Sequence, residues 1–236
     1  MEKLDDDSLG ASRSDYVAGA AKALLGAVPF AGSLLVEIAD AVIPNQRVDR
    51  IAHFAMELQE RIAGLEREHV RAHLTNENFT DLVEEGMRQA ARSTIDDRRR
   101  HIANIIANSL TSEEISFVES KHLLRVLGEI NDIEVVWLRY FLKPTLAGDI
   151  EFRAKHEKVL APQYAESGAS PTIIDQAALQ QSYKQHLAQL GLLRERFKVN
   201  PRTNMLDVDS FGRLRTDGYE LTPLGDLLLR QIGFTE

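Results

Sequence analysis

The chain has 236 residues, a net charge of −8 and no cysteine. The missing thiols exclude disulfides, thiolate metal sites and cysteine nucleophiles. The acidic balance disfavours general attraction to nucleic acid and leaves only a local basic patch for that purpose. Hydrophobic residues make up 44% of the chain but aromatic residues only 6%, a balance that favours helices over sheets. We therefore expect a mainly α-helical globular protein.

The N-terminal region divides into two parts. Residues 1–15 are polar and acidic, which predicts a disordered tail, not a secretory signal, and is compatible with a cytoplasmic location. Residues 16–43 are apolar and rich in small residues, with a break before Pro29 that predicts a helical hairpin. The longest uncharged run in this segment has 14 residues, whereas a bilayer span needs about 20. A simple transmembrane helix is therefore not expected.

The hairpin at 16–43 has two interpretations. Because small residues let helices approach closely, it can be a buried part of the domain. The less favoured alternative is an element that inserts into a membrane or contacts a partner after a trigger, which would place the protein at the periphery of the inner membrane. The candidate contact residues are its large apolar side chains: Leu24, Leu25, Val28, Phe30, Leu34 and Leu35.

A series of helices is expected after Pro44. Apolar residues at three- and four-residue spacing over 48–65 predict an amphipathic helix. Asn76, Thr94 and Asn131 are expected at the starts of further helices, and residues 111–114 have the pattern of a capping box for another. We expect a helical domain over 16–112 and a second domain over 113–236. The second domain would include an irregular excursion at 145–171, where glycine and proline recur.

The last third of the chain predicts a winged helix-turn-helix. A helical pattern over 175–190 is stopped by Gly191, a polar hairpin follows, and a short helix closes the chain at 219–233. This order is typical of the back half of that module, in which the β-hairpin forms the wing. Such modules read DNA or dock on proteins, and neither role is enzymatic.

The DNA-reading hypothesis depends on a few polar side chains. The candidate contacts are Gln180, Gln181, Lys184 and Gln185 on the helix and Arg213 and Arg215 on the wing. Glutamines can read base edges, but a helix with a single lysine holds phosphates weakly. Protein docking or a structural role is therefore favoured over DNA binding.

Other motifs point to structure more than to chemistry. His69 and His73 have a spacing that can hold a metal, but surface histidines explain them better. Residues 207–212 resemble the start of a calcium loop that fails at Phe211, so we interpret them as the tip of the wing. The basic run at 98–101 is spread around a helix and flanked by acids, which favours ion pairs within the protein over an anionic ligand. No phosphate loop, nucleophile elbow or paired-carboxylate motif is present, so we expect no enzyme, cofactor, metal or small-molecule substrate.

Three places in the chain resemble the Abi-alpha family of bacterial proteins, named for abortive phage infection. The first is AGSLLVEIAD at 31–40 with NQR at 45–47. The second is DRRRHIANIIANSL at 97–110 followed by LLRVLGEINDIE at 123–134, and the third is LAQLGLL at 187–193 with YELTPLG at 219–225. The family has no catalytic residues to transfer to this chain. The resemblance implies a role in phage defence and leaves the mechanism open.

Three functional hypotheses follow. The leading one is a non-enzymatic phage-defence protein that acts by binding, through a partner or self-association, with the hairpin at 16–43 directed to a membrane or partner. The second is a winged-helix transcription regulator that binds an operator. The third is a structural subunit of a larger complex.

Overall fold

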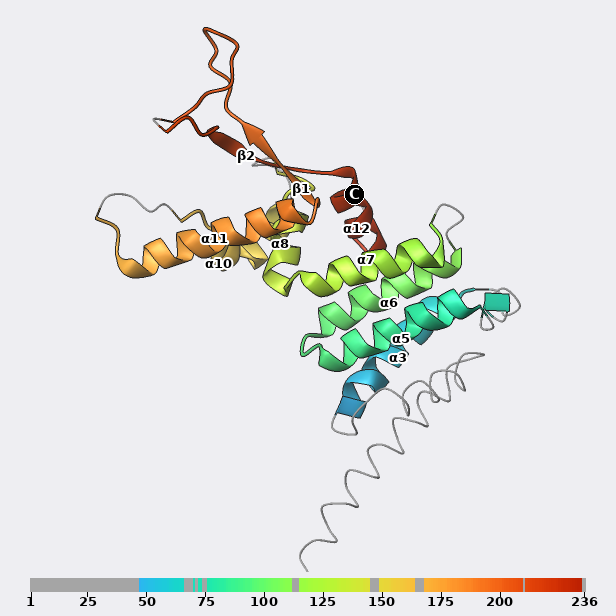
Figure 1. Cartoon of the computed structure of the whole chain (residues 1–236). Helices are drawn as coiled ribbons and strands as arrows, with labels where there is room; N and C mark the ends of the chain where they lie inside the picture. The colour runs from blue at the N-terminus through green and yellow to red at the C-terminus, as the bar shows by residue number, and fades with distance from the viewer. Residues whose placement is uncertain are drawn as a thin grey trace, which may run out of the picture. The chain divides into compact units, whose positions relative to one another are not determined.

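The computed structural model describes residues 47–65, 70, 72–73, 76–111, 115–144, 149–163, 168–209 and 211–234. Within these residues the chain is mainly helical, with one two-stranded antiparallel sheet (Figure 1). It divides into two compact units, the first formed by Met1–Gly128 with Gln231–Gly233 and the second by Glu129–Arg230 with Phe234–Glu236. The tail expected at 1–15 and the hairpin expected at 16–43 lie outside the described residues.

The first unit is built on the helices α3 (Val48–Ile62), α5 (Glu77–Arg92), α6 (Asp96–Thr111) and α7 (Phe117–Glu129), with the last residue of α7 counted in the second unit. The helices α3, α5 and α6 contact one another pairwise (Figure 1). The stripe predicted over 48–65 is confirmed in α3, where Ile51, Phe54, Leu58 and Ile62 are buried. Removal of this apolar surface from water stabilises the unit.

Two predicted helix starts are confirmed by their caps. The side chain of Asn76 accepts hydrogen bonds from the backbone N–H groups of Asn78 (2.9 Å) and Phe79 (3.4 Å) at the start of α5. Asn131 and Glu134 form a complete capping box at the start of α8 (Asp132–Tyr140). Each cap satisfies backbone donors that have no partner within the helix.

The capping box predicted at 111–114 is wrong, because Thr111 is the last residue of α6 and α7 begins at Phe117. The box that starts α7 is formed by Ser116 and Glu119. Ser116 N–H donates to Glu119 Oε2 (2.7 Å), and Glu119 N–H donates to Ser116 Oγ (3.4 Å). The bond from Ser116 holds the pKa of Glu119 below its ordinary value. Leu110 is still buried, so the apolar face of α6 continues up to the residue before Thr111, and Thr111 belongs to the last turn of α6.

The boundary between the units falls within α7, at Gly128/Glu129, whereas the sequence predicted it at 112/113. The cause is that α7 is bonded to the helices before it. Gln89 Nε2 donates to the carbonyl oxygen of Leu124 (2.9 Å), and Arg98 Nη1 donates to that of Leu127 (3.0 Å). Both leucines are buried, so α7 belongs to the first core.

The second unit contains α8, α9 (Ile150–Lys155), α10 (Glu157–Leu160) and α11 (Pro171–Gln189). The irregular excursion predicted at 145–171 is therefore wrong for 150–160, which is helical. Asp149 accepts a hydrogen bond from Phe152 N–H and caps α9. The helix α11 also begins earlier than the predicted 175, because Ser170 caps it and Pro171 occupies its first position, where a missing N–H costs nothing.

A helix, a hairpin and a closing helix follow one another as expected. Strands β1 (Leu193–Phe197) and β2 (Thr216–Leu221) pair from Leu193 opposite Leu221, and α12 (Pro223–Gln231) comes next. Gly191, with φ +74°, ends α11 in the left-handed conformation that favours glycine. A mainly helical chain with a small β-hairpin is confirmed, and the winged-helix assignment stays a prediction.

Candidate binding surface on the C-terminal unit

The hairpin of the second unit divides beyond its two strands into two short arms (Figure 1). Lys198 N–H donates to Arg215 O (2.8 Å), Asp207 N–H to Lys198 O (2.8 Å) and Arg215 N–H to Asp207 O (3.0 Å). The backbone groups of these three residues form a junction. From it the chain runs out and back twice, and each excursion is one arm. The first arm is closed by a bridge between Val199 and Leu206, and the second by a bridge between Val208 and Leu214. We call residues 196–209 and 211–217 the fork.

Both arms expose apolar side chains. Directly opposed residues of an antiparallel pair lie on the same side of the ladder, so each bridge brings two aliphatic side chains together. These four side chains are about half exposed, at 51% for Val199, 52% for Leu206, 47% for Val208 and 43% for Leu214. The turns of the two arms carry the most exposed apolar residues of the fork, Met205 at 71% and Phe211 at 80%. Exposed apolar groups gathered in this way are typical of interaction surfaces.

The turns of the fork are fixed by their own side chains. Asn200 Oδ1 accepts a hydrogen bond from Arg202 N–H (2.9 Å) in the first arm. Asp209 Oδ1 accepts from Phe211 N–H (2.8 Å) and Arg213 N–H (3.0 Å) in the second. Residues 207–209 thus form one side of the second arm and residues 211–212 lie in its turn, in agreement with the predicted strand and tip. Because side-chain bonds of this kind hold a turn in one conformation, the exposed side chains are presented on a pre-organised backbone.

The helix α11 uses Gln180 to hold its own unit together. Its Nε2 donates to the carbonyl oxygens of Ala161 (2.8 Å) and Val159 (3.1 Å), and its Oε1 accepts from Gln163 N–H (3.3 Å). The amide is therefore occupied in binding the end of α10 and the loop after it. A base edge would have to displace these bonds.

Two more of the predicted DNA contacts also have partners in the unit. Gln181 Nε2 donates to the hydroxyl of Tyr219 (2.8 Å), which lies 3.4 Å from Glu195 Oε1. Burial raises the pKa of Tyr219, and the charge of Glu195 adds to the effect. Lys184 Nζ lies 4.9 Å from the centre of the Trp137 ring, and burial lowers the pKa of Lys184.

The remaining DNA candidates are one residue of α11 and two residues of the fork. Gln185 is exposed on α11 and lines a shallow depression with Arg194 and Thr222. Arg213 and Arg215 lie on the fork, where they pair with Asp209 (4.0 Å) and Asp207 (3.6 Å). In the predicted set, Gln180, Gln181 and Lys184 thus contact other residues of their own unit, whereas Gln185 and the two fork arginines are exposed to solvent.

Thr222 joins the two segments 187–193 and 219–225. Its hydroxyl donates to Gly191 O (2.6 Å) and accepts from Gly225 N–H (3.0 Å), and its own N–H donates to Leu192 O (3.1 Å). This threonine therefore caps α12 and ties it to the end of α11. The sequence predicted both segments but not the bond between them.

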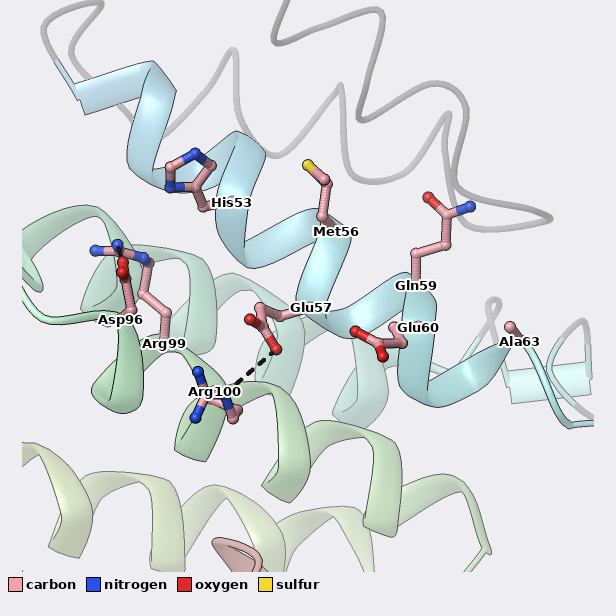
Figure 2. Close-up of a pocket in the computed structure, with 9 residues that line it drawn as sticks. All are labelled: His53, Met56, Glu57, Gln59, Glu60, Ala63, Asp96, Arg99 and Arg100. Carbon is pink, nitrogen blue, oxygen red and sulfur yellow. Dashed lines mark hydrogen bonds and ion pairs between the residues drawn. The ribbon is translucent and has the colours of Figure 1, made fainter.

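The first unit holds a polar depression between α3 and α6 (Figure 2). It has a volume of about 500 Å³, and Met56 at its rim is 52% exposed. Glu57 lies in it 3.8 Å from Arg100 Nε and 2.7 Å from Arg61 Nη1, and Figure 2 shows the first of these pairs as a dashed line. Small-molecule sites are usually enclosed and largely apolar. An open depression whose acid already holds two arginines does not match that description.

The arginines of the basic run at 98–101 form ion pairs and hydrogen bonds within the first unit, as predicted. Arg100 Nη1 pairs with Asp97 (2.9 Å), and Arg99 Nη1 donates to Ser93 O (2.9 Å) while its other nitrogen pairs with Asp96. Arg99 is only 5% exposed, so this part of the run is buried and not solvated. Since these arginines are paired internally, the run is a poor anchor for an external anion.

Three side chains of α6 bind the backbone carbonyl groups of Gln231 and Ile232, which belong to the same unit. Asn104 Nδ2 donates to Ile232 O (2.7 Å), and Asn108 Nδ2 donates to Gln231 O (3.1 Å). His101 Nδ1 lies 3.0 Å from Ile232 O and must carry its proton in order to donate to a carbonyl. We call this set the clasp, and it satisfies carbonyl groups that the end of a helix leaves without partners.

His101 makes the clasp sensitive to acid. Burial lowers its pKa below the ordinary 6.5, against the opposing effect of the bond to Ile232. As the pH falls below about 6.5, the unfolded chain binds this proton first, so stability present above that pH is lost as the pH falls through the folded pKa. Urea unfolding of wild type and His101→Gln between about pH 7.5 and about pH 5 should show a steeper loss in the wild type. Equal slopes would contradict this role of His101.

Among the described residues no group of three or more His, Asp or Glu side chains is placed to hold a metal, and no helix is long and apolar enough to cross a membrane. His69 lies outside the described residues, and the ring of His73 packs edge-on against Phe117. Comparison of the chain with protein-family models, with curated proteins and with solved structures gave no match.

Proposed function

We propose that the protein acts by binding and not by catalysis, and that the fork is its binding surface. The observation that carries the proposal is the gathering of Val199, Met205, Leu206, Val208, Phe211 and Leu214, all at least 43% exposed, on two arms with fixed turns. A folded monomer gains nothing from such exposure, because each buried methylene is worth about 0.8 kcal/mol. Covering these groups by a partner would recover part of that free energy.

The biological role that we propose is phage defence, which rests on the resemblance to the Abi-alpha family. The segments that carry the resemblance stabilise the described structure. Asn104 and Asn108 belong to the clasp, Glu134 completes the capping box of α8, and Thr222 joins α11 to α12. If these segments maintain the fold, the action on a target has to come from other surfaces, and the fork is the best candidate. The hairpin at 16–43 remains a proposed second contact.

The test is protection of bacterial cells against a panel of unrelated phages. Two variants are compared, a tip variant with Met205→Ser and Phe211→Ser and a control variant with Ile95→Ser and Val118→Ser. The control pair is also exposed, at 43% and 60%, but lies in the first unit. We expect the wild type and the control variant to lower the phage yield, and the tip variant to give the yield of cells with an empty vector.

Two results would overturn the proposal. Protection by the tip variant equal to that of the wild type would exclude the fork as the acting surface. Absence of protection by the wild type against every phage of the panel would contradict the defence role. The folded state of both variants is checked by thermal unfolding, since replacement of exposed side chains should change the free energy of unfolding by about 0.5 kcal/mol or less.

The alternative function is DNA binding by a winged helix. It is supported by the exposure of Gln185, Arg213 and Arg215, and it is weakened by the internal bonds of Gln180 and Gln181. A gel shift with DNA from upstream of the coding region distinguishes the two hypotheses. A sequence-specific shift that falls steeply with salt and is lost in Arg213→Gln/Arg215→Gln would favour DNA binding.

A further inference from the structure

The fork differs from the rest of the chain in charge as well as in exposure. Residues 196–217 contain five basic and three acidic residues, in a chain with a net charge of −8. The rest of the chain is therefore more acidic than the chain as a whole. A surface that combines basic charge with exposed apolar side chains fits some classes of partner better than others.

Three of the five cations have no acidic partner among the described residues. Asp207 and Asp209 lie at 3.6 Å and 4.0 Å from Arg215 and Arg213. Arg196, Lys198 and Arg202 make no ion pair with any described residue, and all three are exposed. Their charges are available to an external anion at the base of the fork and in its first arm.

We propose that the fork docks on the surface of an anionic lipid bilayer, a proposal that rests on the fork being the binding surface. Met205 and Phe211 would enter the boundary between headgroups and acyl chains, and the basic side chains would contact lipid phosphates. A bilayer takes both kinds of group at once, since amphipathic elements bind it through buried apolar area and cations together. Nucleic acid offers phosphates and stacking faces but no site for Val199, Leu206, Val208 and Leu214.

The geometry of the arms suits this role. Each arm carries one large apolar side chain in or next to its turn, and the turns are held by Asn200 and Asp209. A pre-organised turn loses little conformational entropy on insertion. Because the remaining chain is acidic, an anionic surface repels it and favours an approach through the fork.

The experiment uses the full chain and vesicles of phosphatidylcholine alone or mixed with phosphatidylglycerol in equal parts. Co-flotation is measured for the wild type, the tip variant, the control variant and a charge variant with Arg196→Gln, Lys198→Gln and Arg202→Gln. We expect the wild type and the control variant to float with anionic vesicles and not with neutral ones. The tip variant should bind roughly tenfold more weakly or worse, and the charge variant should lose about fivefold for each charge removed.

A fluorescent label locates the contact. The chain has no cysteine, so Phe211→Cys and Val118→Cys each accept one environment-sensitive dye at a single position. On addition of anionic vesicles, the dye at 211 should shift to the emission of an apolar environment, and the dye at 118 should not change.

The flotation experiment also has a matched charge control. It carries Arg47→Gln, Arg92→Gln and Arg125→Gln in the first unit, and it should float like the wild type.

Several outcomes would overturn the inference. Flotation of the tip variant equal to that of the wild type would place any membrane contact outside the fork, for instance at 16–43. A dye at 211 that responds to DNA oligonucleotides, or to unlabelled protein in the absence of lipid, would assign the fork to nucleic acid or to a second copy. If the fork enters vesicles but the tip variant still restricts phage, the proposed function fails and the inference stands. If the fork does not enter vesicles but the tip variant loses protection against phage, the inference fails and the proposed function stands.

Discussion

Replacement of Gly225 by alanine is expected to destabilise the C-terminal unit by about 3 kcal/mol. A methyl group at this position would lie 2.3 Å from the carbonyl oxygen of Leu192 and 2.8 Å from Leu221 Cδ1. The carbonyl cannot move away easily, because Thr222 N–H holds it at 3.1 Å. The direction of the expected change is informative, because replacement of glycine by alanine within a helix normally stabilises a protein by about 1 kcal/mol.

Urea unfolding of the full chain measures this effect. The matched control is Gly64→Ala, where an added methyl group meets no atom within 4 Å. The control should change the free energy of unfolding by less than about 0.5 kcal/mol. A Gly225→Ala protein as stable as the wild type would show that the close approach of α12 to Leu192 is not required by the fold.

Replacement of Glu134 by alanine is the second large effect, with an expected loss of about 2 kcal/mol. Glu134 is 3% exposed, and its Oε2 accepts from Asn131 N–H (2.7 Å) while its Oε1 lies 2.7 Å from His186 Nδ1. The change removes one half of the capping box of α8 and leaves two part-buried donors, Asn131 N–H and His186 Nδ1, without their partner, at about 1 kcal/mol each.

The control for Glu134 is Glu129→Ala, which removes an exposed carboxylate at the end of α7 and should be nearly neutral. A double-mutant cycle with His186→Ala separates the bond to histidine from the cap. Coupling between Glu134 and His186 should be measurable. Strictly additive losses would contradict a direct contact between α8 and α11 at this point.

Local patterns in the sequence predicted the parts of the fold that local physics determines. The stripe of α3 and the cap at Asn76 depend on spacing within one helix, and both are confirmed. Two patterns of the same form, at 111–114 and 116–119, compete for the start of α7. The choice between them depends on how far α6 remains buried, which is a tertiary property.

The candidate surface could be predicted only in part. The sequence placed a hairpin tip at 207–212, but the fork depends on the backbone junction of Lys198, Asp207 and Arg215, which no two-strand hairpin pattern brings together. Polar residues of α11 were interpreted as facing a ligand, whereas Gln180 binds carbonyl groups at the end of α10 and in the loop after it. A glutamine amide serves either purpose, and spacing along one helix does not distinguish them.

The central claim is that the fork is the surface through which the protein binds its target in the cell. A photoreactive amino acid placed at 211, 185 or 118 tests it directly during phage infection. Crosslinking at 211 alone, to lipid or protein, is the predicted result. Crosslinking at 185 to DNA, or at 118 with none at 211, would contradict the account.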